Sequence, residues 1–382
     1  MPDRTRFGLK KTTPDRNRWR WTEGIVVAGR VAVGLDIGTS GVRAAELALG
    51  GSPVTLERFG QVGLPPGAVR DGEVVDVDVV GAAIRQLWAQ VRFSTKRVVL
   101  GVANQKVVVR QVDLPWLPAA ELRSSLPFQV QDFIPMPVDK AILDYHPLEE
   151  FQSENGVRML RMLLVAAARD MVTAALAAVS KAGLTTVMVD LTPFAVLRAL
   201  APVDELGLDP EAEALVEVGA GVTNIVVHSG GVPRFVRILL MGGQDVTEAV
   251  AERMGVPLDE AEEVKQSLGM AVEPAGDGAD DSPAGRVIEA TGGAFVQEVR
   301  GSLDYYVAQP TAAPLRRIRL SGGGALLPGL AERLAAATRL PIESASPLER
   351  MRVGKTGLSA EQLHSVSSVA SVPVGLALGM AS

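Results

Sequence analysis

The chain of 382 residues predicts an α/β protein with two lobes that face a shared cleft. Hydrophobic residues make up 47% of the chain and aromatic residues only 4%, so the cores must consist mainly of Val, Leu, Ala and Ile. This length suits two lobes of ordinary domain size better than one simple core. The segments Val33–Arg43 and Leu215–Thr223 also share one plan, in which an apolar strand, an acidic residue, a glycine-rich turn and a second strand follow one another. This internal similarity favours duplicated halves.

Charge and apolar patterning exclude several classes of protein. The formal net charge of −6 gives no reason to expect nucleic-acid binding, because a polyanion requires a positive field. Residues 1–29 are predicted to be a disordered basic extension, since Arg and Lys outnumber acids there and no apolar period is present. The best candidate for a membrane span, Met159–Val179, is interrupted by charged residues. The chain has no cysteine, which excludes disulfides and thiolate metal sites and is consistent with a cytosolic location.

The first lobe is predicted from alternating strand and helix patterns. Strands are expected at Val31–Asp36, Val42–Leu49, Arg97–Ala103 and Thr186–Asp190, with helices at Val77–Val91, Asp170–Ala182 and Thr192–Leu200. Between Asn104 and Arg158 the chain is rich in proline, which indicates an inserted small subdomain. It is expected to contain a strand at Lys106–Val112 and a helix at Ala119–Gln131, and to be closed by a strand at Met159–Ala166.

After a connection at Ala201–Glu211, the second lobe is predicted to contain similar strand and helix patterns. Strands are expected at Ala214–Val218, Asn224–His228, Arg234–Leu240 and Ile318–Ser321, with helices at Gln244–Met254, Leu258–Leu268, Val287–Ala308 and Pro328–Thr338. The acidic Gly/Pro/Asp stretch Pro274–Gly285 is predicted to be a mobile loop. The segment Pro347–Gln362 matches no clear pattern and is expected to be a loop before the last helix.

The two glycine-rich turns are candidates for phosphate binding. In Gly38-Thr-Ser-Gly41 the glycines allow backbone N–H groups to converge on an anion, and Thr39 and Ser40 add hydroxyl donors. Asp36 precedes this turn and is a candidate Mg²⁺ ligand. Either turn alone is also consistent with an ordinary hairpin. Because a third glycine cluster, Ser321–Gly324, lies between a strand and a helix, the set predicts two phosphate turns and an adenine platform.

Other nucleotide motifs fit less well. Gly219-Ala-Gly221 begins a dinucleotide-type pattern, but Asn224 replaces the third glycine and a strand follows the turn in place of a helix. The chain has no P-loop sequence. Glu262 and Lys265 are three residues apart on one helix, a spacing that most often indicates a surface ion pair. The three histidines show no metal-ligand spacing, and no hydrolytic triad is evident.

Three segments resemble the nucleotide motifs of the actin/Hsp70/sugar-kinase superfamily, in the form found in PilM and FtsA. They are Gly34–Leu47, Glu217–Thr223 and Leu320–Leu330. Further segments make the PilM family the closer match: Ile134-Pro135, Leu143-Asp144-Tyr145, Leu164–Ala168, Ala182-Gly-Leu184, Val189-Asp190, Phe194-Ala195, Met241–Asp245 and Asp259–Lys265. The resemblance implies an actin-like two-lobed α/β fold, built from duplicated ribonuclease-H-like domains, with the 1C subdomain of FtsA and PilM.

The resemblance also implies subdomain boundaries. Residues 30–103 and 169–205 correspond to subdomain 1A, and residues 104–168 to subdomain 1C. Residues 206–345 correspond to lobe 2, which is 2A with 2B inserted at about 256–312. Residues 346–382 return to 1A.

The site residues carried over from the family form four groups. The first turn would bind phosphate and Mg²⁺ through Asp36, Gly38, Thr39, Ser40, Gly41 and Arg43, and the second would close on the phosphates through Gly219, Ala220, Gly221 and Thr223. Ribose and base would contact Glu262 and Lys265, and adenine would lie against Gly322, Gly323 and Gly324. Glu217 would be a second metal ligand beside Asp36. Active ATPases of the superfamily usually have Asp there, so ATP and Mg²⁺ binding with weak or no hydrolysis is expected, with Asp36 and Glu217 the catalytic candidates if ATP is hydrolysed.

The resemblance implies a role as a cytoplasmic scaffold of the type IV pilus machine at the inner face of the cell membrane. The expected partner is the N-terminal peptide of a PilN-like inner-membrane protein, which would lie in a 1A/1C groove lined by parts of Val31–Leu47 and Val98–Val112. PilO-like, assembly-ATPase and platform proteins are further partners of this kind, and membrane association would be peripheral. Two alternatives stay open: an FtsA-like cell-division anchor, and a small-molecule kinase of the same superfamily.

Overall fold

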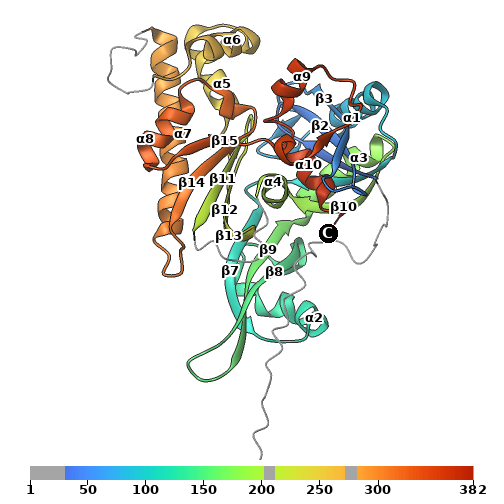
Figure 1. Cartoon of the computed structure of the whole chain (residues 1–382), viewed down its shortest axis with the longest axis vertical. Coiled ribbons are helices and arrows are strands. Elements are labelled where there is room, and N and C mark those ends of the chain that lie inside the picture. The colour runs from blue at the N-terminus through green and yellow to red at the C-terminus, as the bar shows by residue number, and fades with distance from the viewer. Residues whose placement is uncertain (1–30, 202–210, 272–281, 382) are drawn as a thin grey trace, which may run out of the picture.

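The computed structural model describes residues 31–201, 211–271 and 282–381. The predicted basic extension 1–29 lies outside the described residues, as do most of the predicted connection Ala201–Glu211 and most of the predicted loop Pro274–Gly285. The described chain forms two lobes with a further three-stranded sheet below them (Figure 1).

The first lobe is built on a sheet with the strand order β10-β6-β1-β2-β3-β16. Its strands are β1 (Val31–Ile37), β2 (Gly41–Ala48), β3 (Thr55–Gly63), β6 (Arg97–Val102), β10 (Thr185–Leu191) and β16 (Arg352–Val353). Its helices are α1 (Val77–Val91), α3 (Arg169–Lys181), α4 (Thr192–Leu200) and α10 (Ser371–Leu378). Leu35 and Leu100 pack against α1 and α3, whereas Val99 on the other face packs against α4 and α10. Helices cover both faces, which explains why the central strands are almost continuously apolar.

The second lobe repeats this topology with the order β13-β12-β11-β14-β15. Its strands are β11 (Ala212–Val218), β12 (Thr223–Ser229), β13 (Val232–Leu239), β14 (Leu315–Ser321) and β15 (Ile342–Ser344). Its helices are α5 (Gly243–Met254), α6 (Leu258–Leu268), α7 (Pro283–Val307) and α8 (Leu330–Thr338). In both lobes an antiparallel three-strand meander is followed by two strands that pair in parallel. The topology therefore supports the duplication predicted from the two turns.

Helix α4 joins the cores of the two lobes. Phe194 of α4 belongs to the same buried cluster as Leu376 of α10 and Val226 of β12. Figure 1 shows α4 between the second-lobe sheet and α10. Two arginines donate to the carbonyl oxygens at the end of this helix: Arg319 of β14 to Leu200 O at 2.6 Å, and Arg350 to Ala201 O. These bonds also satisfy helix-end carbonyls that would otherwise lack an intrahelical partner.

The inserted subdomain is a sheet with the order β7-β9-β8, packed against one helix. Its elements are β7 (Val107–Pro115), α2 (Ala119–Gln129), the 3₁₀ helices Gln131–Phe133 and Val138–Lys140, β8 (Ala141–Gln152) and β9 (Arg158–Ala168). Leu122 and Leu126 of α2 and Met162 and Leu164 of β9 form its core. All of these elements lie within the segment 104–168 that the sequence assigns to subdomain 1C.

The segment Pro347–Gln362, which the sequence left unassigned, is more than a loop. It contains a 3₁₀ helix (Pro347–Arg350), then β16, and the start of α9 (Ala360–Val366). Arg352 N–H donates to Val54 O at 2.9 Å, and β16 pairs with β3. The segment thus carries the chain from lobe 2 along the edge of the first sheet before α10 begins.

The strand order shows which strands near the expected partner groove have a free edge. Strands β1, β2 and β6, which include most of Val31–Leu47 and part of Val98–Val112, each have a hydrogen-bonded strand on both sides. They cannot offer an edge to an added strand. Among the described strands, the edges available near the junction of the two subdomains are those of β10 in the first sheet and of β7 and β8 in the inserted sheet.

Candidate functional site

Two adjoining cavities lie in the cleft between the lobes. The larger has a volume of about 410 Å³ and the smaller about 70 Å³. Both are lined by the same residues of the two turns: Asp36, Thr39, Ser40, Arg43, Glu217, Gly219 and Ala220. Gly38 lines the smaller cavity, whereas Lys265, Gly323 and Gly324 line the larger. The structure therefore brings the two glycine-rich turns and the third glycine cluster to one site.

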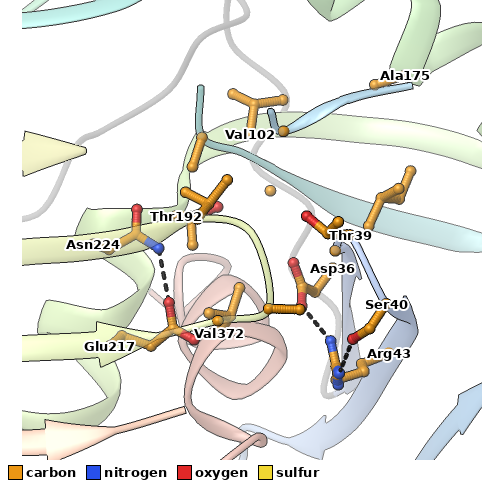
Figure 2. A pocket seen from close by; sticks show the side chains of 18 of the residues that line it. Asp36, Thr39, Ser40, Arg43, Val102, Ala175, Thr192, Glu217, Asn224 and Val372 are labelled. Carbon is orange, nitrogen blue, oxygen red and sulfur yellow. Dashed lines mark hydrogen bonds and ion pairs between the residues drawn. The ribbon is translucent and has the colours of Figure 1, made fainter. Parts of the chain in front are cut away.

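The first turn joins β1 to β2 and is closed by a backbone hydrogen bond. Gly38 N–H donates to Gly41 O at 3.0 Å, which leaves Thr39 and Ser40 at the tip. Asp36 lies opposite Arg43 in the strand register, and their side chains form an ion pair at 3.7 Å. Arg43 also donates to Ser40 Oγ at 3.2 Å, as Figure 2 shows. Because Gly38 N–H is already bonded, the donors that can face an anion are those at the tip of the turn.

The second turn joins β11 to β12 and has the same backbone closure. Gly219 N–H donates to Val222 O at 2.9 Å, with Ala220 and Gly221 at the tip. Glu217 lies opposite Asn224 in the register, in the place that corresponds to Asp36 opposite Arg43. Asn224 Nδ2 donates to Glu217 Oε2 at 2.7 Å, and Asn224 Oδ1 is buried without a hydrogen-bond partner (Figure 2).

The tips of the two turns touch across the cleft. A Cβ atom at Gly221 would lie 2.8 Å from Thr39 Oγ1 and 3.2 Å from Thr39 Cγ2. Such contacts are too close for any side chain, so glycine is what lets the turns approach. Residues 182 positions apart in the chain are thereby brought into contact beside the two cavities.

Burial raises the pKa of both carboxyl groups at this site. For Asp36 the cause is desolvation, partly offset by Arg43. For Glu217 desolvation raises the pKa to about 7, while the hydrogen bond from Asn224 lowers it and the nearby Asp36 raises it. Two desolvated carboxyl groups favour a bound cation, since a cation stabilises their ionised forms. Oxygen ligands of this kind suit Mg²⁺ beside a polyphosphate, so the residues fit the metal that the resemblance implies.

A second polar cluster lies at the other end of the larger cavity. Lys265 is 6% exposed, and its ammonium group donates to Gly243 O at 3.1 Å, Thr247 Oγ1 at 2.9 Å and Glu262 Oε2 at 2.6 Å. Burial raises the pKa of Glu262, but hydrogen bonds from Lys265, Thr247 and Gln266 outweigh it, so the pKa lies below its ordinary value. The expectation of a surface ion pair is therefore wrong, because the pair lines a cavity and its lysine is buried.

The N-terminus of α5 connects this cluster to the second turn. Gly243 N–H donates to Gly219 O at 3.0 Å, and Gln244 N–H donates to Ala220 O at 2.8 Å. Since Lys265 binds Gly243 O, a continuous chain of hydrogen bonds runs from the second turn to Glu262.

Some residues assigned from the sequence do not line either cavity. These are Gly41, Gly221, Thr223 and Gly322. The Thr223 hydroxyl donates to Met241 O at 2.7 Å and the residue is fully buried, so this geometry does not support a phosphate contact by its side chain. Gly322 N–H donates to Ser368 O at 3.0 Å, so this glycine shapes the platform.

The sequence also missed several residues of the site. Gln244, Thr247, Leu64 and Pro66 line the larger cavity, and Gly72, Val74 and Thr192 line the smaller. The Met241–Asp245 segment is the only signal that pointed near Gln244 and Thr247. Nothing in the local pattern around Thr247 separates it from an ordinary helix residue.

A family model and a solved structure indicate the same family. The family model described as type IV pilus assembly protein PilM matches residues 34–381. A solved structure of a PilM–PilN type IV pilus biogenesis complex matches with a TM-score of 0.79 and 28% identity, covering 92% of this chain and 98% of that one.

Two further relatives are more distant. The cell division protein FtsA of Neisseria meningitidis serogroup B is 26% identical over 355 residues, which is 82% of this chain and 83% of that protein. The ethanolamine utilization protein EutJ of Carboxydothermus hydrogenoformans shares the fold, with a TM-score of 0.51 and 18% identity over 93% of this chain and 91% of that one. None of the helices in the described residues has the length and apolar content required to cross a bilayer.

Proposed function

Because the chain belongs to the PilM family of type IV pilus assembly proteins, we propose that it is an ATP-binding scaffold that holds the N-terminal peptide of a PilN-like membrane protein. The observation that carries the nucleotide part is that two duplicated turns and a glycine platform line one interlobe site. The similarity to a PilM–PilN complex over 92% of the chain supports the partner. Such a protein would act at the cytoplasmic face of the inner membrane and reach the membrane through its partners.

In this proposal the phosphates of ATP lie between the tips of the two turns. Backbone N–H groups of Thr39, Ser40 and Ala220, with the Thr39 and Ser40 hydroxyls, would bind the phosphate oxygens. Asp36 and Glu217 would hold Mg²⁺, which supplies charge neutralisation of the polyphosphate. The nucleoside would occupy the larger cavity between Gly323–Gly324 and the Glu262–Lys265 cluster.

The Lys265 cluster would orient the ribose through Glu262. All three donor positions of the Lys265 ammonium already have protein acceptors, so lysine positions Glu262 and the start of α5. Glu262 Oε1 accepts from Gln266 and retains a second lone pair, which can accept a ribose hydroxyl. Lys265→Met is expected to weaken ATP binding about tenfold, because it leaves Glu262 and Thr247 without their shared donor.

Weak or absent hydrolysis is part of the proposal. The carboxyl group of Glu217 is held by Asn224, and its pKa of about 7 leaves a protonated fraction at neutral pH. Glu217 stands where active ATPases of the superfamily usually have Asp, so its carboxyl group reaches one methylene further, and the positioning of an attacking water is sensitive to about 1 Å. Phosphate release is therefore expected to be slower than about 1 s⁻¹, the lower end for kinases.

The partner peptide is proposed to lie between the edges of β10 and β8. Each of these strands pairs with one neighbour only among the described strands. Burial raises the pKa of Asp144 on β8 to about 6, against lowering by Tyr145 N–H and Arg123, and the nearby Asp190 of β10 raises it further. Asp190 is buried and forms an ion pair with Arg198, so Asp144 is the acid at this junction that favours a peptide with a cationic group beside its extended backbone.

Titration of the full chain with a synthetic N-terminal PilN peptide tests the partner. Asp144→Asn is expected to weaken binding about threefold or more, because it removes a charge that faces the peptide. The matched control Asp139→Asn removes an exposed carboxylate of the same subdomain and should bind as the unaltered chain does. Equal weakening by both variants, or no binding by the unaltered chain, would remove the peptide from this groove.

A further inference from the structure

A short hairpin lies between the phosphate turns and the inserted sheet. It consists of β4 (Val69–Arg70) and β5 (Glu73–Val74), and is called the 69–74 hairpin. Gly72 and Val74 line the smaller cavity together with Asp36 and Thr39. The hairpin is thus part of the wall that phosphate would face.

The segment that leads into the hairpin is attached to the first turn. Leu64 N–H donates to Ser40 O at 3.0 Å, and Leu64 and Pro66 line the larger cavity. Val75 N–H and Asp76 N–H both donate to Ala68 O, at 3.0 and 3.1 Å, which closes the base of the hairpin. A shift of the Ser40 carbonyl group therefore acts on the segment that leads into the hairpin, because one backbone bond joins Ser40 to Leu64.

The tip of the hairpin packs directly on the end of β6. Asp71 and Gly72 have φ values of +54° and +76°, which is the backbone of a tight two-residue turn. A Cβ atom at Gly72 would lie 1.9 Å from Ala103 O, so backbone meets backbone with no side chain between. Ala103 follows the last residue of β6, where the chain leaves the first sheet for the inserted one.

Polar bonds continue this contact into the inserted sheet. Glu73 Oε1 accepts from Asn104 Nδ2 at 2.8 Å and forms an ion pair with Lys106 Nζ at 2.7 Å. Asn104 is fully buried, and its side chain also accepts from Lys106 N–H. Val107 N–H, at the start of β7, donates to Asn104 O at 3.1 Å, and Ala168 N–H, at the end of β9, donates to Lys106 O at 3.2 Å. Through Asn104 and Lys106, Glu73 is therefore connected to the start of β7 and to the end of β9.

We propose that the 69–74 hairpin couples nucleotide occupancy to the inserted sheet, and that Glu73 is the positioning residue that transmits the change. This inference rests on the proposed function, because it takes the cavity as the ATP site. Phosphate between the turns displaces Gly72, Val74 and the Ser40–Leu64 bond. The tight turn then moves the segment Ala103–Lys106, which connects β6 to β7. This movement changes the orientation of β7 and β9 and so the width of the peptide groove.

The coupling is reciprocal. If ATP changes the affinity for a peptide on the inserted sheet by some factor, the peptide changes the affinity for ATP by the same factor. This coupling requires that ATP bind differently to the chain when the hairpin is in its original position and when it is displaced. The hairpin provides this difference because Gly72 and Val74 are part of the cavity wall that the phosphates contact.

Hydrogen exchange on the full chain, with and without Mg·ATP, tests the coupling. In the unaltered chain, Mg·ATP should slow exchange in both turns (36–43 and 217–224) and change the exchange rate of β7 about twofold or more. Glu73→Gln keeps an acceptor for Asn104 but loses the ion pair with Lys106. It should retain the protection of the turns and lose more than about half of the response of β7.

Two further variants separate the outcomes. Lys106→Met breaks the same ion pair from the other side, together with the longer pair between Lys106 and Asp170 at 3.7 Å, and should lose at least as much of the β7 response as Glu73→Gln does. Glu154→Gln, at an exposed position of the inserted subdomain, should respond as the unaltered chain does. An unchanged β7 response in both ion-pair variants overturns the role of the hairpin. Protection of the turns with no response of β7 in the unaltered chain overturns the coupling and leaves the proposed function standing. No protection of either turn overturns both.

Discussion

The two glycine-rich turns have the same backbone and different charges. Each is closed by one hydrogen bond, from Gly38 to Gly41 and from Gly219 to Val222, and each carries an acid two residues before its first glycine. In the first turn the acid faces Arg43 across the strand pair, and in the second it faces Asn224. The two turns thus share a backbone shape, while the residue on the neighbouring strand that opposes the effect of burial on each carboxyl pKa differs.

The two carboxyl groups of the site therefore have different neighbours. Asp36 has a cation at 3.7 Å that favours its ionised form against burial. Glu217 accepts a hydrogen bond from the Asn224 amide, and Arg43 lowers its pKa to a smaller extent, so its pKa of about 7 places its titration near neutral pH. Burial raises the pKa of both carboxyl groups, and the group that opposes this rise is a cation at Asp36 and mainly an amide at Glu217.

Asp36→Asn is expected to have the largest effect on the comparison. It removes the carboxylate that would hold Mg²⁺ at the first turn, so Mg·ATP affinity should fall about thirtyfold or more, which corresponds to about 2 kcal/mol. The dependence of ATP affinity on Mg²⁺ should fall with it. Calorimetric titrations at several Mg²⁺ concentrations measure both quantities, with Glu217→Gln as the matched variant of the other turn. If Asp36→Asn keeps the Mg²⁺ dependence of the unaltered chain, Asp36 does not hold the metal.

Glu217→Gln is expected to change how stability depends on pH. The pKa of Glu217 is raised in the folded chain, so the stabilisation that this group contributes is fully present below its unfolded pKa of about 4.5 and is lost as the pH rises through about 7. Between pH 4.5 and 8 the unaltered chain should lose up to about 3 kcal/mol of unfolding free energy that Glu217→Gln does not lose. Urea unfolding at several pH values measures the difference. Parallel pH profiles of the two proteins would show that Glu217 is ionised throughout.

Asn224→Leu is expected to have a smaller effect in the opposite sense. The hydrogen bond from Asn224 lowers the pKa of Glu217, so its removal should raise that pKa further, by roughly one unit or less. The decline of stability with pH should then move to higher pH. The same urea experiment measures the shift, and it should be absent when Asn224→Leu is combined with Glu217→Gln. A shift that persists in the double variant would have another origin.

Most of the fold could be predicted from local patterns, and the exceptions have physical reasons. Helices α1, α4 and α6 were predicted with the bounds they have, because their apolar period and their ends are both clear. Strand β8 was missed because it contains Pro147 and several charged residues, which an edge strand tolerates. Strand β3 was not predicted, because its two glycines and its polar residues interrupt the alternation of apolar and polar residues that indicates a strand.

The site could be predicted only where its residues are close in the sequence. Each turn is a local motif, so Asp36–Gly41 and Glu217–Gly221 were recognisable. The burial of Lys265 depends on Gly243 and Thr247 of another helix, and spacing along one helix cannot reveal that. The 69–74 hairpin likewise has its importance through contacts with Ser40 and Ala103, which only the folded chain brings together.

The central claim is that the two lobes hold one triphosphate from opposite sides. Substitution by an acidic residue at the tip of each turn, one turn at a time, tests this claim most directly. Calorimetric titration with Mg·ATP should show that Thr39→Glu and Ala220→Glu each weaken binding about tenfold or more, because each new carboxylate faces the phosphates. Gln152→Glu adds the same charge at an exposed position of β8, which does not line either cavity, and should bind as the unaltered chain does. If either turn variant binds Mg·ATP with unchanged affinity, that lobe does not hold the phosphates.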